Sequence, residues 1–437
     1  MSDLSPDIQG LIGVGALLAL VLMGVRVYIA AAAVGLLGLV SIIGWDAGAG
    51  MIGTIPHSKS VYYGLSVLPI FILIGFLAFH AGITQDLFDA ARKWLGWVPG
   101  GLAVATVFAA AAFAAVSGAS TATAAVFSRT AIPDMLKYGY SKRLAGGVVA
   151  VGGTLAALIP PSAILVVYAI IVEESVGKLL LAGFIPGIVS AIVYAAIVVV
   201  MCKLKPELGR PIGGYTWRER WRSLPGAAPV LIVVMIIFTA MYMGWATPTE
   251  AGALGAFVVF VMALLRGMGA GKLKDALLET SKMTVMIFSL IWGVLCFVRF
   301  LGFTGLPEDF ANWVVSLPYP PIVIMICILL AYAVLGMFMD AIGMLLLTLP
   351  VVYPAVMALG YDSIWFGIVV VKMAEVCLIT PPIGLNCFVV SAVRPDIPIG
   401  TVFRGAAPFL IADVITLTLF LAFPGIITWI PENMGGF

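Results

Sequence analysis

The stretch Ile379-Thr380-Pro381-Pro382-Ile383-Gly384-Leu385-Asn386 decides how this chain folds. It lies in a long apolar segment, where an uninterrupted membrane helix would be expected. Two adjacent prolines remove backbone donors and clash with the preceding helical turn, so they predict a break in that helix. In lipid, freed backbone groups are tolerated only where protein or a wet cavity surrounds them. Because Thr380 and Asn386 add side-chain oxygens, the stretch predicts a binding site built on a broken helix.

The composition predicts a polytopic, all-α membrane protein. Hydrophobic residues make up 62% of the 437 residues and charged residues only 10%, whereas soluble proteins carry about 25% charge. Apolar runs such as 11–25, 185–201 and 230–245 can span much or all of a bilayer core. The acidic N-terminus lacks the basic region of a cleavable secretion signal, so the first apolar segment is expected to be retained. The five cysteines lie in separate segments and are expected to be packing residues.

Two pairs of apolar segments are separated by very short connections. Segments 100–118 and 120–136 form the first pair, and segments 319–338 and 341–357 form the second. We therefore expect each pair to be a re-entrant helical hairpin that enters and leaves the membrane on one side.

The distribution of Lys and Arg predicts the orientation. With two re-entrant hairpins and the N-terminus outside, nearly all Lys and Arg of the loops fall on the cytoplasmic side, and only Lys59 and Lys178 fall in outer loops. Cytoplasmic loops carry this excess in membrane proteins. Both termini are therefore predicted to be periplasmic.

The two halves of the chain correspond at one constant offset. Pro99 aligns with Pro320, Pro133 with Pro354, and Pro160-Pro161 with Pro381-Pro382. Equivalent segments then cross the membrane in opposite directions, and paired broken helices in inverted repeats are typical of secondary transporters.

This repeat defines the expected domains. The first repeat spans 1–201 and the second spans 226–437, with a basic cytoplasmic linker at 202–225. In both repeats, scaffold helices come first, and an amphipathic arm helix, a hairpin with a broken helix, and a last long helix follow in that order. The expected ranges are 8–81, 83–97, 100–172 and 179–201 in the first repeat and 226–302, 306–315, 319–393 and 405–430 in the second.

The hairpin turns and helix breaks are the candidate binding elements. Hydroxyl groups and unwound carbonyls are oxygen ligands suited to a small cation, and helix N-termini suit an anion. The alternative is that Gly, Ala and Ser merely allow close packing of membrane helices. Two related pairs with their prolines in register favour a transport site.

Few ionisable residues fall inside the expected membrane segments. They are Asp340, Lys372, Glu375 and Arg299 near a helix end. Lys372 and Glu375 are three residues apart and can pair on one helix face, either as a structural ion pair or with a role in substrate binding. Asp340 can cap the return helix of the second hairpin or add charge to an ion site. Glu250 is expected to serve in the N-terminal cap of its helix.

Other kinds of chemistry find little support. No nucleophile–base or metal constellation is present, so the chain is not expected to be an enzyme or to hold a transition metal or an organic cofactor. The stretch Gly267-Met268-Gly269-Ala270-Gly271-Lys272 lacks the spacing and context of a phosphate loop.

A passive ion or solute channel is the alternative to a transporter, although channels usually need several subunits around the pore. No nucleic-acid partner is expected.

Several motifs in order resemble the large membrane subunit of tripartite ATP-independent periplasmic (TRAP) transporters. They are Ser117-Gly118-Ala119-Ser120-Thr121, Ile159-Pro160-Pro161-Ser162, Ala246-Thr247-Pro248-Thr249-Glu250-Ala251, Met339-Asp340 and the opening stretch. The resemblance covers nearly the whole chain. It implies the ion-transporter-superfamily elevator fold, in which a mobile domain bearing the two hairpins slides against a scaffold.

The resemblance also implies an activity and its ligands. Such subunits use a Na⁺ gradient to import a carboxylate, such as a C4-dicarboxylate or sialic acid, from a periplasmic binding protein. A small four-helix membrane subunit accompanies them in the bacterial inner membrane. By motif, the first sodium site comprises Ser117, Gly118, Ser120, Gly153 and Pro160. The second comprises Met339, Asp340, Thr380, Pro381, Gly384 and Asn386. The substrate is expected between the breaks, near Thr121, Thr154, Ser162 and Asn386.

Overall fold

The computed structural model describes residues 5–434, and all regular secondary structure in this range is helical. The helices of the first half are α1 (Pro6–Leu22), α2 (Val27–Ile43), α3 (Trp45–Ser60), η1 (Tyr63–Ser66), α4 (Val67–His80), α5 (Ile83–Leu95), α6 (Gly101–Ser117), α7 (Ser120–Lys137), α8 (Lys142–Thr154), η2 (Leu155–Ala157), α9 (Ala163–Ile171), α10 (Val176–Ala182) and α11 (Phe184–Leu204). Those of the second half are α12 (Trp217–Tyr242), α13 (Pro248–Leu265), α14 (Ala270–Thr304), α15 (Leu306–Ser316), α16 (Pro321–Gly336), α17 (Ala341–Ala358), α18 (Ser363–Cys377), α19 (Leu385–Val393), α20 (Ile399–Ala422) and α21 (Gly425–Asn433).

The fold is that of a multi-pass membrane protein. Within the described residues, seven helical stretches are long and apolar enough to cross a membrane, the longest being Ala270–Thr304. Many of their apolar side chains point outward, such as Leu231, Phe257 and Val285. Outward-facing apolar side chains of this kind suit a lipid environment.

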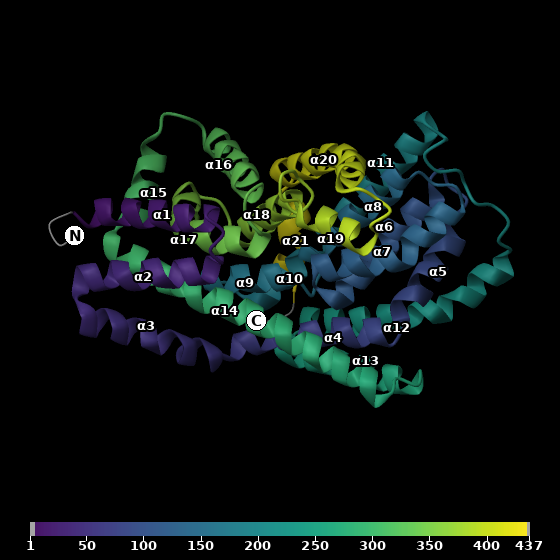
Figure 1. Ribbon diagram of the computed structural model, residues 1–437, viewed down its shortest axis with the longest axis horizontal. Helices are drawn as coiled ribbons and strands as arrows, with labels where there is room; N and C mark the ends of the chain where they lie inside the picture. Colours follow the sequence, from purple (N-terminus) through teal and green to yellow (C-terminus); the bar gives the residue numbers. More distant parts are fainter. Residues whose placement is uncertain (1–4, 435–437) are drawn as a thin grey trace.

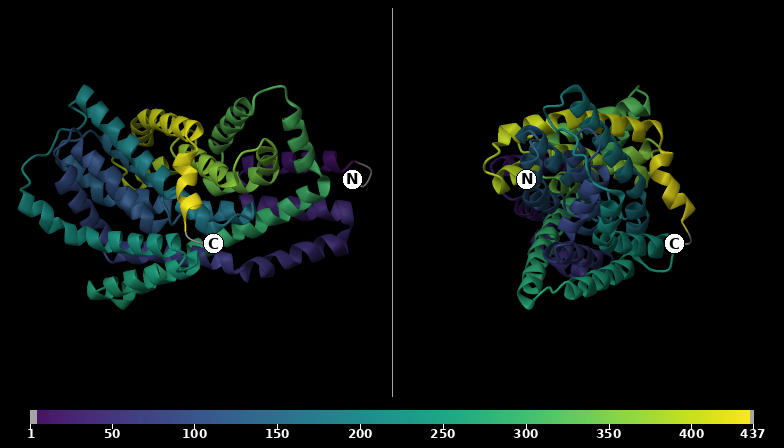
Figure 2. Two further views of the ribbon diagram at one scale, coloured as in Figure 1. Left: turned by 180° about the vertical axis from the view of Figure 1, so that it is seen from behind. Right: turned by 90° about the vertical axis from the view of Figure 1, so that its right-hand side faces the viewer.

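Two groups of helices lie side by side along the long axis of the molecule. Helices α2, α3, α4, α12, α13 and α14 form one long side, and the hairpins and broken helices lie on the other (Figures 1 and 2). Helix α14 packs along α2, and α4 packs against both α13 and α14. The first hairpin, α6 with α7, lies toward the α5 end, and the second, α16 with α17, lies toward the α15 end (Figure 1).

The predicted hairpins, arm helices and breaks are present as helical elements. Helices α5 and α15 stand at the expected arm positions, and α6–α7 and α16–α17 are helix pairs joined by short turns. The helix that would run from α8 into α9 is interrupted at Pro160-Pro161, and the one from α18 into α19 at Pro381-Pro382. Both Pro–Pro bonds are cis. From the arm helix to the end of the broken helix, the same order of elements therefore occurs in both halves.

Side chains cap the helices where the sequence predicts. The Thr247 hydroxyl accepts from the N–H of Glu250, and the Glu250 carboxylate accepts from the N–H of Thr247, which completes a capping box at α13. The structural role expected for Glu250 is confirmed. Asp340 caps α17 by accepting from the N–H of Gly343 at 3.0 Å. This bond establishes the first of the two roles considered for Asp340.

Two predicted boundaries are wrong. The expected helix 405–430 is two helices, because Pro424 prevents α20 from continuing and α21 starts afresh. The range 202–225 is not wholly a linker, since α12 begins at Trp217 behind a capping box formed by Thr216 and Glu219. Helix α3 lies within the expected scaffold range 8–81, although several glycines and Pro56 lower its helix propensity.

Helices α8 and α20 approach too closely for any side chain at their crossing. A Cβ on Gly147 would lie 2.2 Å from the Gly405 carbonyl carbon, and one on Gly405 would lie 1.9 Å from the Arg143 oxygen. This contact joins the broken helix of the first half to the last long helix of the second, so it fixes how the halves meet.

We predict that Gly405→Ala lowers the free energy of unfolding by about 1–3 kcal/mol, because the two backbones must separate. Gly400→Ala is the matched control, since a Cβ there meets nothing within 4 Å on the same helix. Thermal unfolding of the purified protein in detergent measures both. Equal stability of the two variants would contradict the role of this crossing.

Candidate functional site

A cavity lies where the first hairpin tip, the second hairpin tip and both helix breaks meet. This central cavity has a volume of about 120 Å³. The first half lines it with Gly118, Ala119, Ser120, Thr121, Ala163 and Ile164, and the second half with Asp340, Ala341, Ile342, Leu378 and Leu385. Helices α4 and α14 close it with Ile72, Met283, Met286 and Ile287. Elements far apart in sequence therefore share one concave site.

The first hairpin tip sits directly on the first break. Gly118 has a left-handed backbone (φ +58°), and a Cβ on it would lie 2.3 Å from the Pro161 carbonyl oxygen. The N–H of Ala163 faces the Gly118 carbonyl at 3.5 Å. Both the backbone angle and the available space therefore require glycine at this turn.

Ser117 and Pro160 of the first predicted sodium site are also close to this turn. The Ser117 hydroxyl lies 3.0 Å from the Thr123 hydroxyl, which itself donates to the Ala119 carbonyl. Pro160 is buried in the break between η2 and α9. The hydroxyl of Ser117 is therefore engaged within the hairpin.

Ser120, Gly153 and Asn386 come together although the sequence assigns Asn386 to the second site. A Cβ on Gly153 would lie 2.8 Å from the Ser120 carbonyl oxygen and 3.0 Å from Asn386 Nδ2. Asn386 is fully buried, and its Nδ2 donates to the Ala150 carbonyl at 3.0 Å. Its amide thus reaches across to α8 of the first half.

The oxygens of this group fit a small cation. Asn386 Oδ1 and Ser120 Oγ are buried and have no hydrogen-bond partner among residues 5–434. Buried polar atoms without partners are rare, because each costs about 1–3 kcal/mol. Amide, hydroxyl and carbonyl oxygens are hard ligands of the kind that bind Na⁺.

The other members of the second predicted set are more dispersed. Asp340 borders the central cavity, whereas Met339 borders an apolar cavity against α1. The Thr380 hydroxyl donates to the Val376 carbonyl at 2.6 Å. Gly384 (φ +45°) turns the chain into α19, and Pro381 is exposed. The second break and Asp340 share the central cavity, but Asn386 points away from it toward α8.

The residues expected near the substrate divide in the same way. Thr121 lines the central cavity. The Ser162 hydroxyl instead donates to the Ala157 carbonyl and caps α9, and the Thr154 hydroxyl donates to the Val151 carbonyl. Thr121 is therefore the member of this set that faces the cavity.

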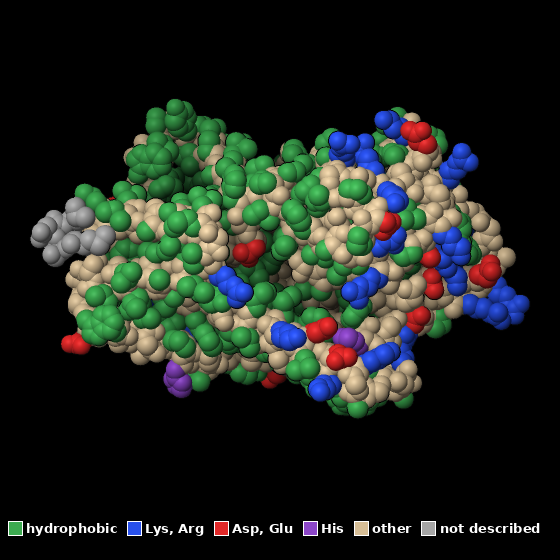
Figure 3. Space-filling model, viewed as in Figure 1, with side chains coloured by type: hydrophobic (Ala, Val, Ile, Leu, Met, Phe, Trp, Pro, Cys, Tyr) green, Lys and Arg blue, Asp and Glu red, His purple; other side chains and the backbone are tan. Residues whose placement is uncertain are grey.

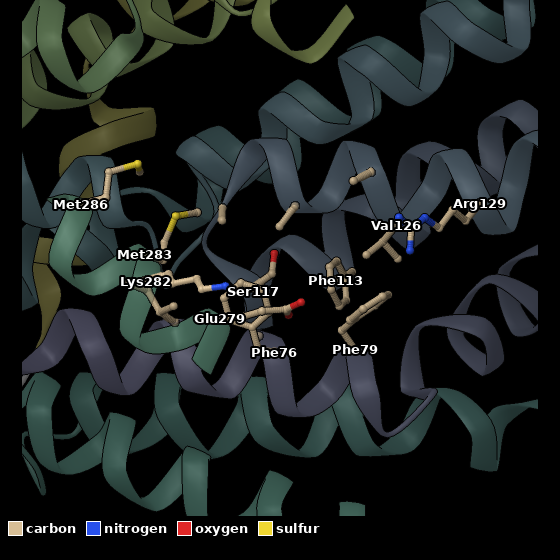
Figure 4. A pocket seen from close by; sticks show the side chains of 15 residues that line it. Phe76, Phe79, Phe113, Ser117, Val126, Arg129, Glu279, Lys282, Met283 and Met286 are labelled. Carbon is tan, nitrogen blue, oxygen red and sulfur yellow. The ribbon is translucent and has the colours of Figure 1, made fainter. Parts of the chain in front are cut away.

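A second cavity of about 430 Å³ adjoins the central cavity and shares Ile72, Ala119, Met283 and Met286 with it. We call it the lateral cavity. It lies between α4 and α14 on one side and the first hairpin on the other, with Arg129, Glu279 and Lys282 among its lining residues. Lys282 extends into the cavity toward Ser117, and Arg129 lies at its far end (Figure 4).

The sequence reasoning missed these lateral charges. Arg129 and Lys282 fall inside the expected helical ranges 100–172 and 226–302, yet neither is among the intramembrane ionisable residues named from the sequence. A cation inside an apolar segment is a functional signal in its own right.

Lys372 and Glu375 form the predicted ion pair, with 2.7 Å between Lys372 Nζ and Glu375 Oε2. Neither residue lines the central or the lateral cavity. Asp413 and Tyr194 also contact the lysine, and the sequence reasoning did not include them. Asp413 lies within the predicted apolar segment 405–430, and an ionisable residue inside such a segment is itself a sign of function.

Comparisons with known proteins agree with this architecture. Residues 14–426 match the family described as tripartite ATP-independent periplasmic transporter, DctM component. The C4-dicarboxylate TRAP transporter large permease protein DctM of Pseudomonas aeruginosa is 35% identical over 86% of this chain and 88% of its own length. The sialic acid TRAP transporter large permease protein SiaM of Vibrio cholerae is 31% identical over 86% of this chain and 88% of its own length.

Solved transporter structures share the fold at low sequence identity. The YdaH transporter of Alcanivorax borkumensis aligns with a TM-score of 0.57 and 15% identity, over 87% of this chain and 89% of that one. MtrF of Neisseria gonorrhoeae aligns with a TM-score of 0.53 and 12% identity, over 86% of this chain and 84% of that one. The fold agrees with the family match and the sequence relatives, which place the chain in the DctM family, the large permease subunits of TRAP transporters.

Proposed function

We propose that this chain is the permease of a Na⁺-coupled importer for an organic acid. Family membership implies a small membrane subunit and a periplasmic binding protein as partners. Relatives named for C4-dicarboxylates and sialic acid support a carboxylate of this kind as the substrate. The observation that carries the proposal is the central cavity, which both hairpin tips and both helix breaks border. The small subunit is proposed to have four helices.

The charge distribution supports an orientation in the bacterial inner membrane. Lys and Arg gather at the end that carries α5 and the start of α12, far from the N-terminus (Figure 3). Cytoplasmic surfaces carry such an excess. We therefore assign this end to the cytoplasm and the opposite end, where α1 lies, to the periplasm. The loop charges support a periplasmic C-terminus as well.

The position of the lateral cavity supports an elevator mechanism. Its walls are α4 and α14 of the proposed scaffold and α6 and α7 of the proposed mobile unit, which comprises 100–172 and 319–393. Because the cavity lies between the two units and toward the basic end, we assign this conformation to the cytoplasm-facing state.

Ser120, Gly153 and Asn386 are the residues we propose to hold Na⁺ at the first break. The ion would supply positive charge beside the site of a carboxylate. The buried, unpartnered oxygens of Ser120 and Asn386 support this assignment. Arg129 and Lys282 of the lateral cavity would attract the carboxylate along its exit path.

The complex should take up substrate in proteoliposomes only with an inward Na⁺ gradient, the small subunit and the loaded cognate binding protein. Radiolabelled uptake with each component omitted in turn measures this requirement. Full uptake by this chain alone, without a gradient or binding protein, would refute the proposal. Ionic currents without saturable, gradient-coupled flux would instead favour a channel.

Asn386→Ala and Ser120→Ala should each raise the Na⁺ concentration for half-maximal uptake roughly tenfold, which corresponds to about 1.4 kcal/mol. Both variants remove an oxygen proposed to bind the ion. Ser128→Ala is the matched control, because this buried hydroxyl on the same helix as Ser120 already donates to the Ala124 carbonyl. Thr380→Ala tests the second predicted site in the same assay. Unchanged Na⁺ dependence in Asn386→Ala and Ser120→Ala would refute their assignment.

Lys282→Ala should raise the internal substrate concentration for half-maximal exchange roughly fivefold, because one charge pair is worth about 1 kcal/mol at an open site. Substrate exchange in proteoliposomes measures the effect at the cytoplasmic side. Lys274→Ala is the control, since Lys274 is an exposed residue of α14 that does not line the cavity. Equal exchange by both variants would exclude Lys282 from the exit path.

A further inference from the structure

Four polar side chains from three helices meet in the interior, away from the central cavity. They are Lys372 and Glu375 of α18, Asp413 of α20 and Tyr194 of α11, and we call them the charge cluster. Lys372, Glu375 and Tyr194 are fully buried, and Asp413 is 1% exposed. Helix α20 packs against both α11 and α18.

Lys372 is fully satisfied as an ammonium ion. Its Nζ lies 2.7 Å from Glu375 Oε2, 2.8 Å from Asp413 Oδ1 and 3.1 Å from the Tyr194 hydroxyl oxygen. An ammonium has three N–H donors, and three acceptors are present. The lysine is therefore charged, and it is the source of positive charge in the cluster.

The two carboxylates exceed this one positive charge. The charged side chains on the elements packed against α18, α20 and α11 are exposed or half-buried, and they belong to Lys142, Arg143, Lys178, Lys203, Arg404 and Glu432. Lys142 pairs with Asp396, and Arg143 donates to the Arg404 carbonyl. The nearby tyrosines also have other partners: Tyr168 donates to the Ser363 carbonyl, Tyr353 to the Ser363 hydroxyl, and Tyr332 shares a hydrogen bond with Thr348. With both carboxyl groups ionised, the cluster would carry one uncompensated negative charge.

Each carboxyl group also leaves one oxygen without a side-chain partner. Asp413 Oδ2 is buried and accepts no hydrogen bond within the described part of the chain, and Glu375 Oε1 is buried with no side-chain donor, while the backbone N–H of Leu158 interacts with the Glu375 carboxyl group. An isolated buried charge is strongly disfavoured, and such a group neutralises itself instead. A metal ion is a poor remedy, because the ammonium beside it would repel it and at most two oxygens are free.

We propose that the charge cluster is a binding site for one proton and that Glu375 carries it. Asp413 Oδ1 accepts from both Lys372 and Tyr194, the latter at 2.5 Å, whereas Glu375 accepts from Lys372. Hydrogen bonds to an ionised carboxylate stabilise that form, so Glu375, which lacks the short tyrosine hydrogen bond, is the carboxyl group that takes the proton. The cluster is then neutral.

The site connects the proton to both broken helices. The Tyr194 hydroxyl lies 3.4 Å from that of Thr154, the last residue of α8 before the first break. Glu375 lies in the last turn of α18, just before the second break. Loss of the proton would place an unpaired charge where these helix ends are held together. The inference rests on these contacts and does not depend on Na⁺ coupling.

Infrared difference spectroscopy of the purified complex at neutral pH tests the proposal directly. Wild type minus Glu375→Gln should show the C=O band of a buried carboxylic acid, and wild type minus Glu432→Gln should not, because Glu432 is exposed on α21. Asp413→Asn should also lose the band, since Glu375 then becomes the only counter-ion of Lys372. A band that persists in Glu375→Gln or Asp413→Asn would overturn the proposal.

Isotope labelling identifies the carrier. When glutamate is labelled with carbon-13 in its side-chain carboxyl group, the band should move to lower frequency if Glu375 holds the proton. An unmoved band would assign the proton to Asp413 and overturn the assignment to Glu375.

The pH dependence of stability supplies a second readout. The folded protein holds a proton that the unfolded chain releases at neutral pH, so stability falls as the pH rises until the folded protein has lost the proton as well. The proton-linked slope should differ by about one proton between wild type and Glu375→Gln over that range. Identical slopes in the two proteins would overturn the proposal.

Discussion

Backbone groups that a helix break frees inside a bilayer must find partners in protein, because lipid offers them no hydrogen bonds. At the first break, the Ser162 hydroxyl donates to the Ala157 carbonyl, and the Ala163 N–H faces the Gly118 carbonyl of the hairpin tip. At the second break, the Asn386 N–H donates to the Leu378 carbonyl at 3.0 Å. The breaks are tolerated because these contacts provide partners for freed backbone groups, and residues beside both breaks line the central cavity.

The two breaks share a backbone plan but not an environment. Ile159, Pro160 and Pro161 are buried, whereas Pro381 and Pro382 are exposed. The second break nevertheless contributes to the first, because the Asn386 amide bonds to the Ala150 carbonyl and lies beside Gly153. The candidate cation site is therefore composite, so the two halves must be in their correct relative positions before its oxygens converge. The close crossing of α8 and α20 holds that position.

Local features could be predicted from the sequence, and long-range partners could not. The Pro–Pro breaks and hairpin turns follow from backbone chemistry within a few residues, and the structure has them at the predicted positions. The hydrogen-bond partner of the Asn386 amide depends on how α19 packs against α7 and α8, which no local sequence pattern specifies. The partners of Lys372 required the same knowledge: Asp413 was visible as an acid in an apolar segment, but its distance from the lysine depends on helix packing. The bounds of helix α3 could not be predicted either, because its glycines weaken the local helix signal and tertiary packing stabilises the helix.

The charges are distributed in a way that gives the proposed ion coupling a physical rationale. Of the described residues that line the central cavity, Asp340 alone is charged, while Arg129 and Lys282 lie in the lateral cavity and Lys372 is sealed in the charge cluster. A carboxylate entering this cavity would meet a like charge, and at 4 Å such a pair costs about 4 kcal/mol at an effective dielectric constant of about 20. A bound cation offsets this repulsion and can leave the site together with the substrate. A fixed lysine would attract the carboxylate in every conformation and so hinder release of the substrate. A site without its own fixed cation therefore favours a substrate that arrives together with a positive ion.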